Sequence, residues 1–233
     1  MPIWWFRSIL DLIRLPNGSS SPDGPRVASG PAQDFDFSMS PPRKTLSHLP
    51  MTGLPDMPTL TSTELKRLHR DRRRETSGRI AMLLDSVQTP YNVGSILRSA
   101  AAFGVEHLWL VGATESPTHP KTQKTALGSQ RFITWTTVES IEEAVTDVHS
   151  AGFRLVGIEL AVGAVPMHEL KLAPAICLAV GHEDRGLSKT CLSLCDDLAY
   201  IPQIGAIGSL NVATAASIAL YEARRQEWNQ QQS

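Results

Sequence analysis

Apolar residues recur along this chain in two patterns, as short uninterrupted runs and at the spacing of a helix with one buried side. The longer segments predict helices at residues 92–103, 141–151, 188–195 and 211–228. The short apolar runs predict strands at residues 80–84, 108–111, 132–134, 154–158, 176–180 and 198–201. Strands that alternate with helices indicate an α/β protein with a mainly parallel sheet. The continuous apolar run 176–180 is typical of a strand buried on both faces.

Residues 1–58 differ in composition from the rest of the chain. Pro, Gly and Ser are concentrated there, which predicts a disordered, low-complexity extension. The apolar run 3–15 is interrupted by Arg7, Asp11 and Arg14, so it is too short and too charged to span a bilayer. We expect a mobile tail or a short amphipathic helix that docks a partner, with an interfacial helix as the alternative. No other stretch of the chain is long enough to span a membrane.

Residues 59–78 form a basic segment in a chain whose net charge is only −1. Between Thr61 and Ile80, seven Lys or Arg residues face three acidic ones, which leaves a local excess of four positive charges. We expect a helical arm with Ser62 or Thr63 as its cap. Such a run is either a solvated face or an arm that contacts RNA phosphates. The candidate RNA contacts are Lys66, Arg67, Arg70, Arg72, Arg73 and Arg74.

The cysteines argue against a disulfide framework and against a metal site. Cys177 falls within a predicted buried strand, and Cys191 and Cys195 are spaced like one face of a helix. A zinc site would need a fourth ligand at a suitable spacing, and we find none. We therefore predict reduced core thiols in a reducing compartment, the cytoplasm.

Three polar segments interrupt the apolar pattern after residue 79. Asn92 and Arg98 lie six residues apart on one predicted helix, so they could share a wet edge beside its buried stripe. Arg98 has small and apolar neighbours, which is unusual for a side chain so costly to bury unpaired. A snorkelling side chain or an internal ion pair would also explain this placement.

The other two segments are loops that follow strands. Residues 181–188 hold an isolated Glu183 between two glycines, and an ordinary strand-to-helix loop capped by Ser188 would explain them. Residues 201–212 combine Pro202 with two glycines, a Ser and an Asn. Backbone that needs both Pro and Gly usually approaches something closely, although a tight turn with a helix cap is the simpler interpretation.

Together and in this order, the three segments resemble the SpoU (TrmH-like) family of RNA ribose 2′-O-methyltransferases, within the SPOUT superfamily. The motif Asn-x-Gly-x-x-x-Arg is matched by Asn92, Gly94 and Arg98. The motif Gly-x-Glu-x-x-Gly-Leu-Ser is matched by Gly181, Glu183, Gly186, Leu187 and Ser188. The third motif is matched by Ile201, Pro202, Gly205, Ser209, Leu210, Asn211 and Val212. The chain departs from the family at His182, where Asn is frequent, and at Ala213, where Ser is common.

This resemblance implies a methyltransferase domain at residues 79–233 with a C-terminal trefoil knot, S-adenosylmethionine as cofactor, and a homodimer that acts on tRNA or rRNA. It implies catalytic roles for Arg98, Asn92, Glu183, Ser209 and Asn211. It implies a cofactor pocket built by Leu178, Val180, Gly181, Ile201, Gly205, Ser209 and Leu210. Residues 117–129 are similar to a substrate-facing loop, with Lys121 and Lys124 as RNA contacts, or else form a surface loop ending in a short helix.

The expected chemistry is methyl transfer to a ribose hydroxyl. Arg98 is a poor base because an Arg side chain keeps its proton, so we expect it to bind the phosphate beside the target ribose. The proton acceptor stays open between His182 and Glu183. A catalytically silent RNA-binding relative is disfavoured because the polar motif positions are intact. A small-molecule enzyme that binds another nucleotide is disfavoured because neither common phosphate-binding glycine motif is present.

Overall fold

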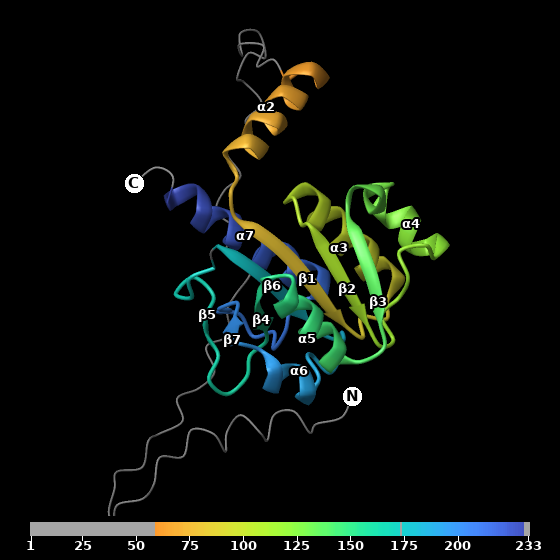
Figure 1. Ribbon diagram of the computed structural model, residues 1–233, viewed down its shortest axis with the longest axis vertical. Coiled ribbons are helices and arrows are strands. Elements are labelled where there is room, and N and C mark those ends of the chain that lie inside the picture. Colours follow the sequence, from red (N-terminus) through yellow and green to blue (C-terminus); the bar gives the residue numbers. More distant parts are fainter. Residues whose placement is uncertain (1–58, 173, 231–233) are drawn as a thin grey trace, which may run out of the picture. The chain divides into compact units, whose positions relative to one another are not determined.

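The computed structural model describes residues 59–172 and 174–230, so the extension predicted at residues 1–58 lies outside the described residues. The described part contains a parallel sheet of seven strands (Figure 1). The strands pair in the order β3-β2-β1-β6-β4-β7-β5, and each neighbouring pair is parallel. Their bounds are β1 Arg79–Asp85, β2 His107–Val111, β3 Thr134–Val138, β4 Arg154–Ile158, β5 Val165–Pro166, β6 Ala175–Val180 and β7 Asp197–Tyr200. The predicted mainly parallel α/β fold is confirmed.

One predicted strand is wrong. Residues 129–132 form a short 3-10 helix, η1 (Ser129–Phe132), and the strand begins only at Thr134. The apolar pair Phe132-Ile133 misled the prediction, because Phe132 is exposed and only Ile133 enters the core. β3 itself carries three Thr residues and lies at the edge of the sheet, so its polar side chains remain in water. β5 was missed because a two-residue edge strand that contains Pro166 leaves no pattern.

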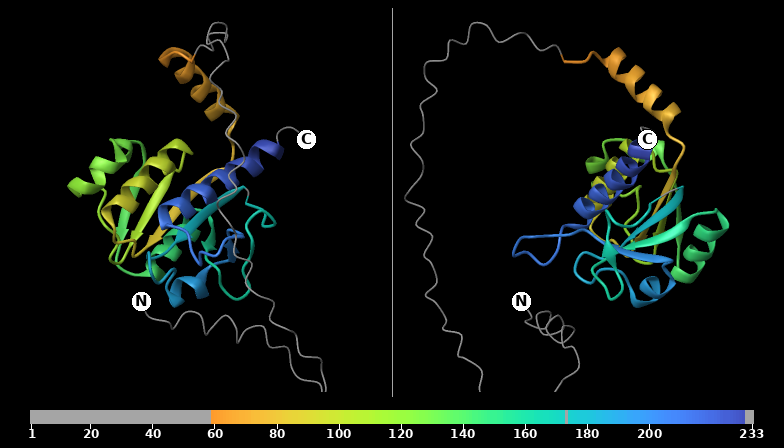
Figure 2. Two further views of the ribbon diagram at one scale, coloured as in Figure 1. Left: turned by 180° about the vertical axis from the view of Figure 1, so that it is seen from behind. Right: turned by 90° about the vertical axis from the view of Figure 1, so that its left-hand side faces the viewer.

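Helices cover both faces of the sheet (Figure 2). On one face α3, α4 and α7 pack over a core that includes Leu84, Ile96 and Leu220. On the other face α5 and α6 pack over a core that includes Leu83 and Val148. Cys177 and Cys191 are buried in this second core, as predicted for core thiols, and Cys195 is half-buried. The helix bounds are α2 Ser62–Glu75, α3 Pro90–Ala102, α4 Pro120–Ala126, α5 Ile141–Ser150, α6 Lys189–Leu194 and α7 Val212–Gln230.

The helix starts follow from capping chemistry. The cap of α2 is Thr61, not Ser62 or Thr63, because Thr61 Oγ1 accepts the Glu64 N–H at 3.3 Å while the Thr61 N–H donates to Glu64 Oε2 at 2.8 Å. This reciprocal pair satisfies two groups at once, which neither neighbouring residue could do. α3 begins two residues before its predicted start because Pro90 suits the first helical turn.

The C-terminal half of α7 is joined to the end of the sheet where the strands begin, here called the amino end. The Arg224 guanidinium donates to the carbonyls of Gly78, Phe103 and Gly104 at 2.7, 2.9 and 3.1 Å. It also pairs with Glu227 at 2.8 Å, and both side chains are almost completely buried. Glu227 accepts the N–H groups of Ser77 and Gly78, each at 2.7 Å. The segment that leads into β1 is therefore fixed to α7.

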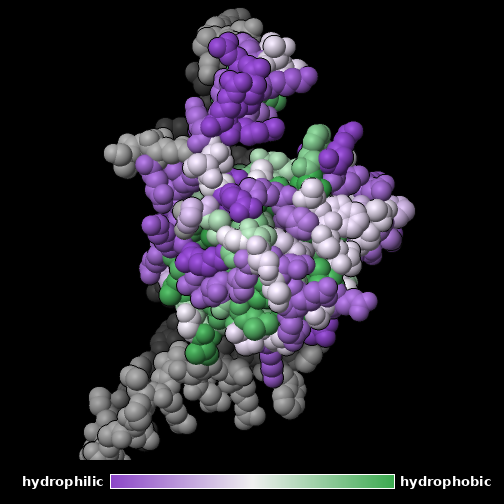
Figure 3. Space-filling view, viewed as in Figure 1, coloured by the Kyte–Doolittle hydropathy of each residue, from purple (hydrophilic) through white to green (hydrophobic). Residues whose placement is uncertain are grey.

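The predicted basic arm is the helix α2. None of its residues is buried, and Figure 3 shows it covered by hydrophilic side chains. Its contact with α7 places the Arg72 guanidinium 5.9 Å from the ring centre of Trp228. Within the described residues, no helix combines the length and the apolar character needed to cross a membrane.

Candidate active site

The three polar segments meet at the end of the sheet where the strands finish, here called the carboxyl end. β1 and β6 are neighbours, and β4 lies between β6 and β7. The loop before α3 follows β1, residues 181–188 follow β6, and residues 201–211 follow β7. The chain order of the strands reverses between β1 and β6, and ligands of open α/β sheets bind beyond the carboxyl ends of strands at such a point.

A chain of hydrogen bonds joins the three segments. Asn92 donates its side-chain amide to Glu183 Oε1 at 2.9 Å. Asn211 donates its own amide to Asn92 Oδ1 at 3.0 Å. The remaining oxygen of Asn211 accepts the N–H groups of Ala213 and Thr214 at 3.0 and 3.2 Å, which caps α7. The predicted residues Asn92, Glu183 and Asn211 are thus brought together by direct contacts, although they lie as much as 119 positions apart in the sequence.

The Glu183 carboxylate accepts several hydrogen bonds. Besides Asn92, the backbone N–H groups of Thr89 and Gln88 donate to it at 2.9 and 3.3 Å. Partial burial raises the pKa of this carboxyl, but the hydrogen bonds lower it by more, and the resulting pKa is about 2. Glu183 is therefore ionised at neutral pH and holds its proton too weakly to be an effective base. His182, the other candidate, accepts the Asp184 N–H on Nδ1 at 3.0 Å, and no described residue bonds its Nε2.

Two further carboxylates hold the 181–188 loop, and the sequence prediction missed both. Asp85, at the end of β1, is almost fully buried and accepts the Ser188 N–H at 2.8 Å. Glu159 follows β4 and accepts the Leu187 N–H at 3.2 Å. The only signal in the sequence is a single acidic residue at the end of each apolar run, which also marks an ordinary strand boundary.

The motif glycines make room for the protein's own chain. A Cβ at Gly181 would lie 2.2 Å from the Gly186 carbonyl, and a Cβ at Gly94 would lie 2.6 Å from the Thr122 carbonyl. Gly181 thus lets the loop fold on itself, and Gly94 lets α3 and α4 pack closely. A Cβ at Gly205 would meet no atom within 4 Å, so the space beside it is open to a ligand. Of the two glycines expected to admit a ligand, Gly205 alone leaves that space free.

Arg98 and Ser209 are not part of the hydrogen-bonded cluster. Both are exposed and make no hydrogen bond or ion pair with any described residue. The expected wet edge shared by Asn92 and Arg98 is wrong, because six residues turn a helix by about 600°, so the two side chains leave α3 roughly 120° apart. The ion-pair alternative for Arg98 is also excluded within the described residues.

The predicted cofactor residues fall into two groups. Leu178 and Val180 are buried in the sheet, so their side chains belong to the core. Residues 202–210 are all exposed and form no hydrogen bond with any described residue. Ile204 and Ile207 are fully or largely exposed, and Leu210 and the half-buried Ile201 lie at the two ends of this loop. Free backbone groups beside apolar side chains suit a flat heterocyclic ligand.

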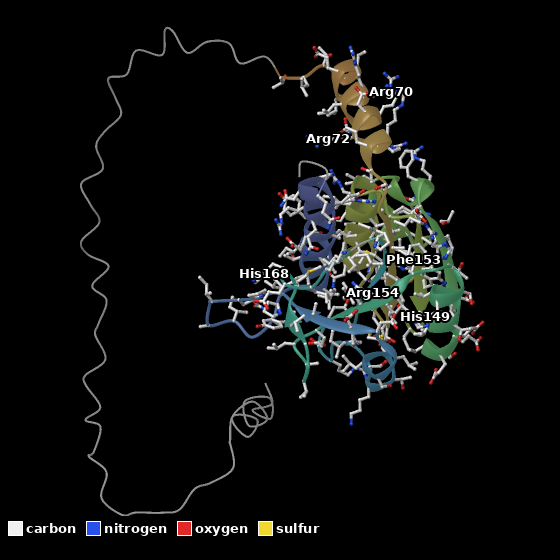
Figure 4. The ribbon with its side chains drawn as sticks, turned by 60° about the vertical axis from the view of Figure 1, so that its left-hand side comes forward. Arg70, Arg72, His149, Phe153, Arg154 and His168 are labelled. Atoms are coloured by element: carbon white, nitrogen blue, oxygen red, sulfur yellow. The ribbon has the colours of Figure 1, made fainter. Side chains whose placement is uncertain are left out.

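The predicted RNA contacts are all accessible. Lys121 and Lys124 are exposed on α4, a short helix within the segment 117–129, and their contact with RNA stays a prediction. The six basic residues of α2 are exposed as well, and Figure 4 labels Arg70 and Arg72 among them. Arg67 and Arg70 approach Asp71 at 3.8 and 3.9 Å, which is long for an ion pair and leaves them free to meet phosphates.

A shallow cavity of about 400 Å³ lies at the opposite, amino end of the sheet. It is lined by His149, Gly152, Phe153, Arg154, Pro174, Ala175 and Asp196 (Figure 4). Its polar side chains are already paired, His149 with Asp196 and Arg154 with Asp197, each at 3.0 Å. Because the motif residues are at the other end, we place the candidate site at the carboxyl end.

Fold and site together define an α/β protein that gathers Asn, Glu and Asn side chains from three separate chain segments at the carboxyl end of a parallel sheet. The chain belongs to the SpoU rRNA Methylase family, whose profile matches residues 79–221. The predicted family resemblance is confirmed.

Relatives and solved structures agree with this assignment. The chain is 35% identical over 150 residues to an uncharacterized tRNA/rRNA methyltransferase of Synechocystis sp., covering 64% of this chain and 54% of the relative. It is 32% identical to the 23S rRNA (guanosine-2′-O-)-methyltransferase RlmB of Acinetobacter baylyi, covering 63% and 60%. The AdoMet-bound rRNA methyltransferase from Sinorhizobium meliloti superposes with a TM-score of 0.61 at 34% identity, covering 65% and 57%. The chain thus spans between half and two thirds of the length of these relatives.

Proposed function

We propose that this protein transfers a methyl group from S-adenosylmethionine to a ribose 2′-hydroxyl of tRNA or rRNA. The observation that carries the proposal is the Glu183–Asn92–Asn211 chain of hydrogen bonds, because it unites polar residues of all three family motifs at one place. The names of the Synechocystis and Acinetobacter relatives support RNA as the substrate class and, for the latter, the 2′-oxygen as the acceptor.

The residues at the carboxyl end fit the cofactor. Residues 202–210 offer backbone N–H and carbonyl groups that no described residue uses, beside the open space at Gly205. Ile204, Ile207 and Leu210 are the apolar side chains available to cover a purine. Gly181 follows the end of β6, Ile201 follows the end of β7 and borders this loop, and Ser209 lies within the loop. When bound, S-adenosylmethionine supplies a methyl group that its sulfonium already activates.

Arg98 is proposed to bind the phosphate beside the target ribose and to stabilise the negative charge that develops on the oxygen. Its guanidinium is exposed and has no partner among the described residues, so it is free to bind an anion. It does not reach the Asn92–Glu183 cluster of its own chain. We therefore propose a homodimer in which Arg98 of one protomer completes the site of its partner.

The dimer proposal has a matching surface. Tyr91 of α3 and Ile218 and Tyr221 of α7 are 54%, 39% and 50% exposed, which is high for large apolar side chains. They lie on two helices that pack against each other, through the contact of Ser99 with Ser217 at 2.7 Å. Burying these side chains against a second copy would remove apolar surface from water. The resemblance adds two further proposals, a trefoil knot in the C-terminal part of the domain and a cytoplasmic location.

Glu183 is proposed to position the loops and not to remove the hydroxyl proton, because a carboxyl with a pKa of about 2 is a weak base at neutral pH. His182 is then the remaining candidate acceptor, since its Nε2 has no partner among the described residues. Ser209 and Asn211 border the same place, with Asn211 holding the start of α7 through its side-chain oxygen.

The proposal is tested by incubating the full-length chain with methyl-labelled S-adenosylmethionine and bulk RNA. Digestion to nucleosides and mass spectrometry should then reveal label on the ribose 2′-oxygen. Binding of RNA and cofactor without any transfer would identify a catalytically silent relative. Absence of cofactor binding in calorimetry would instead favour an enzyme that uses another nucleotide.

A further inference from the structure

Two stretches of the chain, here together called the basic layer, contain basic residues and no acidic ones. Residues 86–105 and 116–138, which contain α3, α4 and η1, include no Asp or Glu, although the whole chain has 23 acidic residues against 22 basic ones. The layer contains four Lys or Arg residues, all exposed and none paired with a carboxylate of the described residues: Arg98, Lys121, Lys124 and Arg131. Glu106 and Glu115 lie between the two stretches and α7 carries Glu222 and Glu227, so attraction for a polyanion is concentrated at the four exposed basic side chains of the layer.

Within this layer, η1 holds an aromatic ring out in water. Phe132 is 73% exposed, the highest value of any described aromatic side chain, while the next residue, Ile133, is buried. The Arg131 guanidinium lies 5.4 Å from the centre of the Phe132 ring. A cation over an aromatic ring at this distance is attracted to the face of the ring.

Backbone geometry fixes the Arg131 side chain in this position. Its Nε donates to the Gly128 carbonyl at 3.0 Å. Gly128 has a φ of 83°, and a Cβ there would lie only 2.8 Å from Arg131 Nη2, so the glycine lets the guanidinium lie close against the backbone. The η1 turn thus orients a planar cation beside an exposed ring before any ligand arrives.

The location links the two regions already expected to meet RNA. Thr134, just after this pair, is in register with His107 at the amino end of the sheet, the same end at which the arm α2 joins β1. The preceding helix, α4, carries Lys121 and Lys124 and packs against α3. α3 begins at the carboxyl end of the sheet and carries Arg98. Arg131 and Phe132 therefore lie between α4, which carries the two lysines, and the end of the sheet at which the arm joins.

We propose that Arg131 and Phe132 form a stacking platform for an unpaired RNA base, while Lys121 and Lys124 contact the adjoining phosphates. Single-stranded RNA is recognised by stacking of its bases on aromatic rings and guanidinium planes, combined with a basic groove for the backbone. A paired helix cannot use such a platform, because its bases are already stacked on each other. This inference rests on the proposed function for its substrate class and deepens it to unpaired nucleotides next to the methylated one.

The test compares Phe132→Leu with Phe132→Trp in the full-length chain. The first variant keeps an apolar side chain but removes the π-face, and the second enlarges that face. Filter binding should show roughly tenfold weaker binding of a single-stranded oligoadenylate for Phe132→Leu. Phe132→Trp should bind it at least as tightly as the wild type. A blunt RNA duplex of the same length should bind both variants equally. Val162→Ala, at another exposed apolar side chain, should bind oligoadenylate like the wild type.

Three results would overturn the platform: unchanged oligoadenylate binding in Phe132→Leu, an equal loss for the duplex, or a loss of self-association in sedimentation, which would assign Phe132 to contact with a second copy. The methyl-transfer assay on the wild type separates this inference from the proposed function. If the wild type transfers the methyl group but Phe132→Leu binds oligoadenylate as tightly as the wild type, the platform is refuted and the proposed function stands. A Phe132 effect on oligoadenylate binding without any transfer supports the platform and refutes the proposed function.

Discussion

The two ends of this parallel sheet differ in how their backbone groups are satisfied. At the amino end, Arg224 and Glu227 together bond five backbone groups of the chain segments 77–78 and 103–104. At the carboxyl end, acidic and Asn side chains also accept backbone N–H groups of residues 88–89, 187–188 and 213–214, but residues 202–210 form no hydrogen bond with any described residue. The sheet thus has a closed end that contributes stability and an open end, so called because one of its loops, residues 202–210, keeps its backbone polar groups available to ligands, as expected of a binding loop.

The largest effect should come from breaking the closed end. Arg224→Ala leaves Glu227 buried without its cation and leaves three carbonyls without a donor, so it should lower the free energy of unfolding by about 3–5 kcal/mol. Arg225→Ala is the matched control, since Arg225 also pairs with a Glu three residues away on α7 but is only partly buried. Arg225→Ala should lower the free energy of unfolding only slightly. The measurement is urea unfolding monitored by circular dichroism. An equal loss of unfolding free energy in both variants would contradict the comparison.

Arg98→Ala should affect the open end without affecting the closed one. Because Arg98 is exposed and unpaired, its removal should leave the urea midpoint unchanged. Turnover should fall by about a hundredfold or more if the guanidinium stabilises charge in the transition state. Arg98→Lys should also be poor, because an ammonium cannot replace a planar fork of donors. Near-normal methyl transfer by Arg98→Ala would remove Arg98 from the site.

Glu183→Gln should have a smaller effect that depends on pH. A Gln side chain presents an N–H₂ group where the carboxylate accepts backbone N–H groups, so the loops should shift and turnover should fall by up to about a hundredfold.

The sign of the pH effect follows from the lowered pKa. The folded pKa of about 2 lies below the unfolded value, so this carboxylate contributes stability that is complete above about pH 4.5 and is lost as the pH falls towards 2. Urea midpoints measured across this window should decline less steeply in Glu183→Gln than in the wild type. If the urea midpoints of the two proteins declined in parallel with falling pH, the pKa of Glu183 would not be lowered by folding.

The smallest effect should come from the arm, which belongs to neither set of loops. In Arg72→Ala/Arg73→Ala/Arg74→Ala, RNA affinity should fall across sequences, and the slope of its logarithm against log salt should flatten by roughly one unit per lost contact. Turnover at saturating RNA should change little, because the arm binds substrate and transition state alike. Filter binding from low to moderate salt that shows an unchanged slope would identify α2 as a solvated face.

Sequence patterns predicted the buried parts of the fold better than the exposed ones. The run 176–180 is typical of a strand because burial on both faces leaves it without polar residues, and it is found as β6. The strand placed at 132–134 failed because Phe132 is apolar without being buried. Periodicity reports burial, and it misleads wherever an apolar side chain is exposed.

The candidate site shows the same limit. The motifs pointed to Asn92, Glu183 and Asn211, but their mutual contacts span 91 and 119 residues and depend on strand order, which local patterns do not encode. Asp85 and Glu159 were not predicted, because a single acidic residue after an apolar run also marks the end of an ordinary strand. The motif assigned Arg98 a catalytic role and its spacing suggested an edge shared with Asn92, but the two side chains leave α3 roughly 120° apart.

The hydrogen-bonded chain through Asn92 has a consequence for how this protein tolerates genetic change. Asn92 uses its amide N–H₂ for Glu183 and its oxygen for Asn211, so both partners depend on one side chain with a fixed orientation. A substitution at any of the three leaves a neighbour with an unmet donor or acceptor. The cost of the second change therefore depends on whether the first is already present. We expect strong epistasis among these positions, so that descendants of this gene replace the three together or keep them all.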